Sequence, residues 1–268
     1  MNSDEIPNHA ESEHAESEQS ENPAIDTDAV DASDQTAGTP SDNLSHYWAW
    51  LFVGLVAAIL AVVLTKVMLS EFQAPLPDDY SEIVAAGPMG ERYTEAEAMI
   101  AVNDTTNHGR LLSSLGVLMA VLFGWAAGFL NQRFVAGIIG ALVAIVVAVP
   151  LGWFTAGPIL ELQDTAISSV GSGDIYAMLL HTLQWIVIGL PSAIAVGIGA
   201  GRATAGVKVA GGFALSALLA AVIYVIGGTL LDPSSSLANA QPQPGIVFYV
   251  WTCLTPMLCG VFLWRSKV

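Results

Sequence analysis

The sequence predicts an all-α integral membrane protein built as a bundle of six membrane-spanning helices. Hydrophobic residues occupy 53% of the 268 positions and charged residues only 12%, whereas a soluble domain carries about 25% charged residues. Six apolar runs are each close to the roughly 20 residues that a helix needs to cross a bilayer. In two of these runs a small residue recurs at every fourth position, a spacing that lets helices approach closely in lipid.

Residues 1–44 form a polar, acidic segment ahead of the first apolar run. They contain half of the 24 acidic residues, and the first basic residue of the chain is Lys66. Such a segment has too few bulky apolar side chains to offset the entropy cost of ordering it, so we expect a disordered N-terminal tail. The net charge of −16 argues against nucleic-acid binding, which requires a basic surface.

Residues 45–268 are expected to form the transmembrane domain. The first span begins with Trp48 and Trp50, which suit an interfacial aromatic belt, and the long acidic segment before it favours a retained anchor over a cleaved signal peptide. The predicted spans are 47–69, 111–130, 134–155, 177–199, 209–231 and 246–264.

The loop 70–110 is the largest predicted segment between spans, and within it 91–104 is expected to form a short helix that packs on the bundle. Basic residues indicate the orientation, because Lys and Arg accumulate in short cytoplasmic loops. Six spans place five of them on one side (Arg133, Arg202, Lys208, Arg265, Lys267) and three on the other (Lys66, Arg92, Arg110). We therefore expect both termini in the cytoplasm and the loop 70–110 outside it. The host membrane would be the cell membrane, which is the inner membrane in a bacterium.

The small residues of the second and fourth spans follow the same order. The second span has Gly116, Ala120, Gly124 and Gly128, and the fourth has Gly189, Ala193, Gly197 and Gly201, 73 positions later. In the spans that follow, Gly140, Ala144 and Ala148 match Gly212, Ser216 and Ala220 at an offset of 72. This pattern predicts a duplicated two-helix hairpin, in spans 2–3 and 4–5, of the parallel kind. Chance agreement in a chain rich in Gly and Ala is the alternative.

We interpret the eight small residues of these two stripes as helix-packing positions. Gly199, two residues beyond Gly197, is rotated by about 200° and is expected to face away from that surface. The segment GIGAGRA is not interpreted as a dinucleotide-binding loop, because that fingerprint requires a preceding strand in a soluble βαβ unit.

The segment GSGD at 171–174 resembles the Gly-x-Gly-Asp signature of intramembrane aspartyl proteases. Enzymes of that family need a second aspartate on a neighbouring span, since two carboxylates share the acid–base work. None of the six predicted spans contains an aspartate. We interpret the segment as a Gly-Ser turn with Asp174 near the start of the fourth span, and we expect no catalytic residue and no cofactor.

His181 and Gln184 lie one helical turn apart in the fourth span and are the weak functional candidates of the sequence. Ionisable groups inside a membrane are functional hypotheses by default, although a neutral histidine bonded at a helix interface is the simpler interpretation. Asp104 and His108, four residues apart, could share a metal ion, but two ligands are too few to predict a site. Cys253 and Cys259 are interpreted as small buried hydrophobic residues.

The sequence therefore favours a non-enzymatic packing or interaction component of the membrane. Its expected partners are the lipid bilayer and either another membrane protein or further copies of the chain. The alternative is a small transporter or channel built on the duplicated hairpin, with His181 and Gln184 near an outer vestibule.

Overall fold

The computed structural model describes residues 40–74, 80, 82, 93–169, 171–231, 237–241 and 245–266. The predicted disordered tail lies outside these residues except for its last positions. The first helix begins at Pro40, so residues 40–44 are helical rather than part of a tail.

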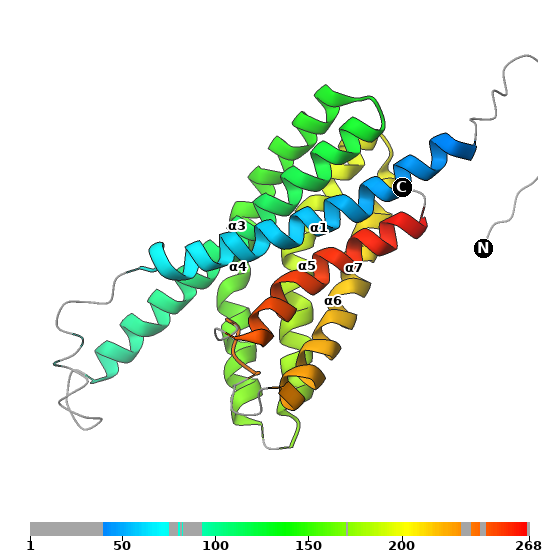
Figure 1. Ribbon diagram of the computed structural model, residues 1–268. Coiled ribbons are helices and arrows are strands. Elements are labelled where there is room, and N and C mark those ends of the chain that lie inside the picture. The colour runs from blue at the N-terminus through cyan, green and yellow to red at the C-terminus, as the bar shows by residue number, and fades with distance from the viewer. Residues whose placement is uncertain are drawn as a thin grey trace, which may run out of the picture. The chain divides into compact units, whose positions relative to one another are not determined.

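Six helices in the described residues are long and apolar enough to cross a membrane, and these residues include no strand. This confirms the predicted fold class. The helices are labelled in Figure 1, and their bounds are α1 (Pro40–Glu71), α3 (Tyr93–Leu130), α4 (Phe134–Ser168), α5 (Gly173–Ala200), α6 (Ala203–Leu231) and α7 (Ile246–Ser266).

α3 and α4 extend furthest beyond the spans that the sequence predicted. α3 starts at Tyr93, so much of the predicted loop 70–110 is helix continuous with the second span, and α4 continues to Ser168 rather than ending near residue 155. No proline or glycine lies between Tyr93 and His108, so nothing in the backbone stops the helix where the sequence becomes polar. The candidate membrane span of α3, Ala96–Leu130, has 35 residues and is about 52 Å long, against a hydrocarbon core of about 30 Å.

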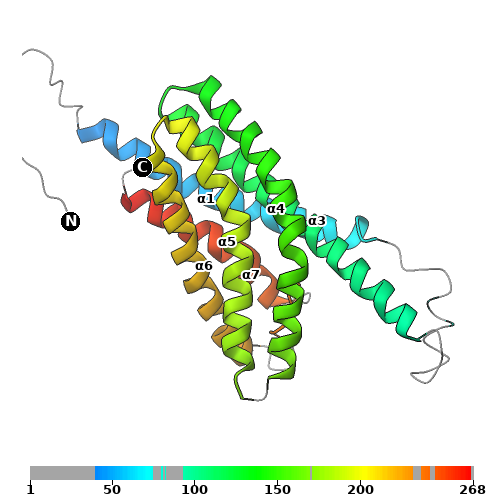
Figure 2. The same cartoon turned by 180° about the vertical axis from the view of Figure 1, so that it is seen from behind.

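The chain that leaves α1 is tied to the extended part of α3. The backbone N–H of Ala74 donates to Asn107 Oδ1 (2.7 Å), and Asn103 Nδ2 donates to the carbonyl oxygen of Ala74 (3.1 Å). Arg110 Nη1 donates to the carbonyl oxygen of Phe72 (3.1 Å). The end of α1 therefore lies beside residues 103–110 of α3, and the first turns of α3 project beyond it (Figures 1 and 2).

The bundle consists of two hairpins and an outer pair of helices. α3 and α4 form one hairpin, α5 and α6 form the other, and α5 also packs on α3 and α4. α1 and α7 pack against each other, and they reach the hairpins through contacts of α1 with α3 and of α7 with α6. Buried aromatic rings join these units: Trp50 stacks on Phe123 at 6.2 Å between centroids, and Phe123 meets Phe213 edge-on at 5.3 Å.

The crossing of α1 and α7 depends on two glycines that the sequence analysis did not single out. A Cβ atom at Gly54 would lie 2.8 Å from the carbonyl oxygen of Pro256, and one at Gly260 would lie 2.8 Å from that of Trp50. Because both neighbours are backbone atoms, no side-chain rotation could make room. The two helices therefore approach too closely there for any residue with a side chain.

The two hairpin turns share one backbone geometry. Gln132 and Gly201 both have a left-handed conformation, with φ of 54° and 67°. In each turn the next residue donates its N–H to a glycine carbonyl oxygen five positions earlier. Arg133 donates to the carbonyl oxygen of Gly128 (2.7 Å), and Arg202 donates to the carbonyl oxygen of Gly197 (3.0 Å). The equivalent positions of the two turns are therefore 69 residues apart.

Helix contacts follow the same offset of 69. Gly128 faces Gly137 across the first hairpin, and Gly197 faces Gly206 across the second. The two hairpins therefore share a turn geometry and a facing glycine pair at an offset of 69, about one helical turn from the offsets of 73 and 72 in the sequence pattern, and the duplication itself stays a prediction. A residue that recurs every four positions matches itself at each shift of four, so the small-residue pattern alone could not select the correct alignment.

Both hairpin turns lie at the same end of the bundle, which we call the turn end. The guanidinium group of Arg133 packs against the backbone of Gly201. The start of α1 and the end of α7 also lie there, because Ala49 borders a groove with Leu130 and the rings of Trp48 and Trp264 are 6.2 Å apart. Lys66 and Tyr249 mark the other end, where Lys66 Nζ donates to the tyrosine hydroxyl (2.8 Å).

Candidate functional site

The small residues of α3 lie against α4 and α5. A Cβ atom at Gly116 would lie 3.4 Å from that of Ala148, and one at Gly124 would lie 2.7 Å from that of Ala195. Ala120 is fully buried in a cluster with Ala144 and Ala195, and a Cβ at Gly128 would be 2.6 Å from the Cα of Gly137. This whole stripe therefore lies at close helix contacts.

The corresponding residues of α5 face α6 less uniformly. Gly189 has no room for a side chain because the ring of Phe213 lies on it, and the carbonyl oxygen of Ala193 would be 2.6 Å from a Cβ at Gly206. A Cβ at Gly197 would have only ordinary contacts, the nearest at 3.6 Å. Gly201 lies just beyond α5, as its left-handed C-cap, where glycine avoids the strain of a positive φ.

Gly199 does not face away from the bundle, contrary to the expectation from its rotation relative to Gly197. A Cβ atom there would lie 2.9 Å from the carbonyl oxygen of Gly124 and 3.2 Å from the backbone N of Gly128. The physical reason is that α5 packs on α6, its hairpin partner, and also on α3 and α4 of the other hairpin. Both faces of α5 are therefore packing faces.

Four buried polar side chains meet away from the turn end, and we call them the polar cluster: His108 on α3, His181 and Gln184 on α5, and Trp251 on α7. Gln184 Nε2 lies 3.2 Å from His108 Nε2, its Oε1 lies 3.0 Å from His181 Nδ1, and the indole Nε1 of Trp251 donates to that Nδ1 (3.0 Å). Tyr224 on α6 closes the site, with its ring edge-on to His181 at 4.5 Å. The cluster thus joins four helices.

The polar cluster also holds the segment between α6 and α7. His181 Nε2 bonds the carbonyl oxygen of Leu237 (2.9 Å), and Gln184 Nε2 donates to the carbonyl oxygen of Ala240 (2.7 Å). The N–H of Ala240 donates to Gln163 Oε1 on α4 (2.6 Å). The hydrogen bonds of His181 and Gln184 among the described residues therefore go to protein groups, and the outer vestibule expected beside them stays a prediction.

The partners of His181 determine where its proton lies. An indole N–H can only donate and a carbonyl oxygen can only accept, so Nδ1 accepts from Trp251 and Nε2 carries the proton donated to Leu237. In this tautomer Nδ1 and Gln184 Oε1 are both acceptors, so their 3.0 Å contact is not a hydrogen bond. With Gln184 Nε2 donating to His108 Nε2, the His108 proton lies on Nδ1, which has no partner among the described residues. Trp185 Nε1 is likewise buried and without a described partner. These two donors are the unsatisfied groups beside the cluster.

The other residues considered for chemistry do not converge. Asp104 is exposed while His108 is buried, so the two side chains turn to different surroundings. Asp174 lies in the first turn of α5 after the turn at Gly171, whose φ is 83°. Among the described residues there is no group of three or more His, Cys, Asp or Glu side chains placed to hold a metal ion.

The sequence analysis missed His108, Gln163 and Trp251 as partners of His181 and Gln184. His108 and Gln163 fell in segments that were expected to be loops, and Trp251 carried no signal beyond its place in an apolar run. The extension of α3 and α4 is what brings the first two to the cluster.

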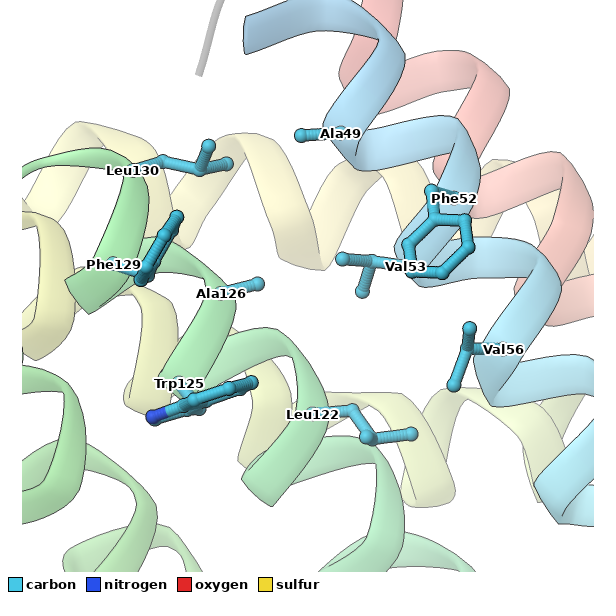
Figure 3. A pocket seen from close by; sticks show the side chains of 9 residues that line it. All are labelled: Ala49, Phe52, Val53, Val56, Leu122, Trp125, Ala126, Phe129 and Leu130. Carbon is cyan, nitrogen blue, oxygen red and sulfur yellow. The ribbon is translucent and has the colours of Figure 1, made fainter.

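An apolar groove runs between α1 and α3 near the turn end, and we call it the α1–α3 groove (Figure 3). Its volume is about 330 Å³. Three aromatic side chains along it are more than half exposed: Phe52 (66%), Trp125 (53%) and Phe129 (55%). The complete lining is Ala49, Phe52, Val53, Val56, Leu122, Trp125, Ala126, Phe129 and Leu130.

The chain matches no protein-family model, and no curated protein or solved structure matches it.

Proposed function

We propose that the protein is a non-catalytic interaction component of the membrane, which binds a transmembrane helix of another membrane protein in the α1–α3 groove. The observation that carries this proposal is the groove itself, an apolar concavity with exposed aromatic side chains on a multi-pass membrane protein. Lipid supplies no hydrophobic driving force for helix association, so complementary packing must supply it. A concave surface offers an incoming helix more contact than a smooth one.

The aromatic residues of the groove suit this role. Phe52 comes from α1, Trp125 and Phe129 come from α3, and the three lie around one opening (Figure 3). Large, rigid aromatic side chains bring much contact area at a small cost in conformational entropy and dominate many interfaces. Trp125 and Phe129 lie four residues apart, with their ring centroids at 6.2 Å, so they present a preformed rim to the partner.

The orientation proposed with this function places the turn end in the cytoplasm. Arg133 and Arg202 lie in the two turns, and Arg265 lies at the end of α7 on the same side. Short basic segments stay on the cytoplasmic side. In this orientation the α1–α3 groove opens in the cytoplasmic half of the bilayer.

Site-specific photo-crosslinking in native membranes tests the proposal. A photoreactive residue at Phe52 or at Trp125 should give one discrete protein adduct of the same mass from both positions. Val146 on α4 and Leu230 on α6, exposed by 73% and 78%, are control positions and should give no such adduct. Ala126→Phe, which fills the groove, should abolish the adduct. Identical adducts at the control positions, or adducts that survive Ala126→Phe, would refute the proposal.

A small transporter or channel is the second candidate, and the polar cluster is the observation that favours it. His108 and Trp185 keep a buried donor without a described partner, and buried polar groups of this kind accompany translocation pathways. In proteoliposomes, a transporter would carry solute or protons at a rate that falls when His181→Gln is introduced. Equal fluxes in liposomes with and without the protein would count against this candidate.

A further inference from the structure

A second groove lies between α5 and α6 at the turn end, and we call it the α5–α6 groove. Its volume is about 460 Å³, within the range of ligand-binding clefts. Ile194, Ile198 and Val207 line it with apolar side chains, Gly197 and Gly206 line it with backbone, and Arg202 is its cationic residue. We propose that this groove binds an anionic phospholipid, with an acyl chain along the apolar lining and the phosphate at Arg202.

The turn-end crossings of the two hairpins differ slightly in how closely their glycines approach. At the crossing nearest the first turn, a Cβ atom on Gly128 would lie 2.6 Å from the Cα of Gly137. At the equivalent crossing of the second hairpin, a Cβ on Gly197 would lie 3.6 Å from the Cα of Gly206. Measured from the other glycine of each pair, a Cβ on Gly137 would lie 2.9 Å from the Cα of Gly128, and one on Gly206 would lie 3.3 Å from the Cα of Gly197. The second pair is therefore held slightly farther apart than the first. The α5–α6 groove lies beside this crossing and includes both of its glycines in the lining.

Two guanidinium groups lie at this end of the groove. Arg202 is exposed and borders the groove, and Arg133 packs against Gly201, another of its lining residues. Among the described residues, no side-chain hydrogen bond or ion pair engages either guanidinium. Guanidinium groups bind phosphate oxygens through paired hydrogen bonds, and basic pockets between transmembrane helices bind anionic lipid head groups.

The combination of charge and lining selects a lipid over other anions. A free phosphate ion would satisfy the arginines and leave the apolar groove empty, whereas a zwitterionic lipid would fill the groove and present less net negative charge to the arginines. An anionic phospholipid matches both parts. This inference concerns a different surface from the α1–α3 groove and stands without the proposed function.

Native mass spectrometry of the full chain released from detergent micelles tests the inference. The probes are phosphatidylglycerol and phosphatidylcholine with identical acyl chains. The wild-type protein should retain phosphatidylglycerol in preference, and Arg202→Gln should reduce that retention about tenfold, as expected for the loss of a charge-assisted hydrogen bond. Arg265→Gln, which removes one positive charge at the same end but away from the groove, should leave the retention unchanged.

A second variant tests the apolar part of the site. Gly197→Leu adds a side chain that meets only ordinary contacts at its Cβ and extends into the groove, so the protein should fold and retain little of either lipid. Thermal unfolding in detergent verifies the fold of each variant. Equal retention of both lipids by the wild type, equal losses in Arg202→Gln and Arg265→Gln, or full retention in a folded Gly197→Leu protein would each overturn the inference.

Discussion

Gly199 is a position of α5 where an added side chain has very little room. A Cβ atom there would lie 2.9 Å from the carbonyl oxygen of Gly124, 3.2 Å from the N of Gly128 and 3.3 Å from the Cβ of Ala127. Two of these neighbours are backbone atoms of α3, so the helices must separate to admit a larger residue. Gly199→Leu is therefore expected to lower the free energy of unfolding by about 1–3 kcal/mol, the range measured for overpacked cores.

Gly197→Leu is the matched control for this substitution. It adds the same side chain to the same helix at nearly the same bilayer depth, but its Cβ has no neighbour closer than 3.6 Å. We expect a change within about 0.5 kcal/mol, as for substitutions at uncrowded positions. Gly124→Leu should resemble Gly199→Leu, because its Cβ would lie 2.7 Å from that of Ala195.

Thermal or denaturant unfolding of the purified protein in detergent, followed by far-UV circular dichroism, measures all three variants. If Gly197→Leu were as damaging as Gly199→Leu, the assignment of the tight α3–α5 contact to Gly199 would be refuted. If Gly124→Leu were harmless while Gly199→Leu was not, the two glycines would not share a contact. The expected order is opposite to the one that the small-residue stripe of the sequence suggests.

Three further substitutions or fusions give independent tests. Gly54→Leu places a Cβ 2.8 Å from the carbonyl oxygen of Pro256 and should lower the unfolding temperature. The control Gly211→Leu, whose Cβ has nothing within 4 Å, should leave that temperature unchanged. Equal effects of the two substitutions would contradict the close α1–α7 crossing. His181→Leu leaves the Leu237 carbonyl and the Trp251 indole without their partner, which costs about 1–3 kcal/mol for each unsatisfied group. The backbone amides of 237–241 should therefore exchange hydrogen faster than in the control variant Leu179→Ala. Unchanged exchange would show that the polar cluster does not hold this segment. Reporter fusions at residues 45, 90 and 268 should read cytoplasmic, extracytoplasmic and cytoplasmic, and an extracytoplasmic signal at 268 would reject the orientation.

The number and order of the spans could be predicted from the sequence because membrane crossing depends on length and hydropathy, which are local properties. The ends of the helices were less predictable, because hydropathy marks where a span leaves the bilayer and not where its helix stops. The polar residues 93–108 marked the end of the apolar run, but a helix stops only where the backbone is interrupted or its caps are favoured. α3 therefore begins at Tyr93, and the helical extension carries His108 into the bundle.

The repeat illustrates a different limit of sequence analysis. Small residues at a spacing of four predict that a helix packs closely, but not which neighbour it packs against, because a periodic pattern has no unique alignment. The two turns can be aligned in only one way, because Gln132 and Gly201 share a left-handed backbone conformation. In addition, the N–H of the arginine after each of them donates to the carbonyl oxygen of the glycine five positions earlier. From the sequence, a left-handed turn residue could be expected at Gly201 but not at Gln132, since glutamine rarely adopts a positive φ.

The contrast between the two hairpins connects the packing to the proposed sites. Close contact at Gly128 and Gly137 closes the first hairpin at its turn, and the exposed face of its first helix then carries Trp125 and Phe129 toward α1. The second hairpin holds the equivalent glycines slightly farther apart, and an apolar groove lies beside them next to Arg202. The two hairpins thus border two grooves of different chemistry, one aromatic and uncharged, the other bordered by a cation. If both proposals hold, filling the α1–α3 groove with Ala126→Phe should abolish the protein adduct without changing lipid retention, and Gly197→Leu should do the reverse.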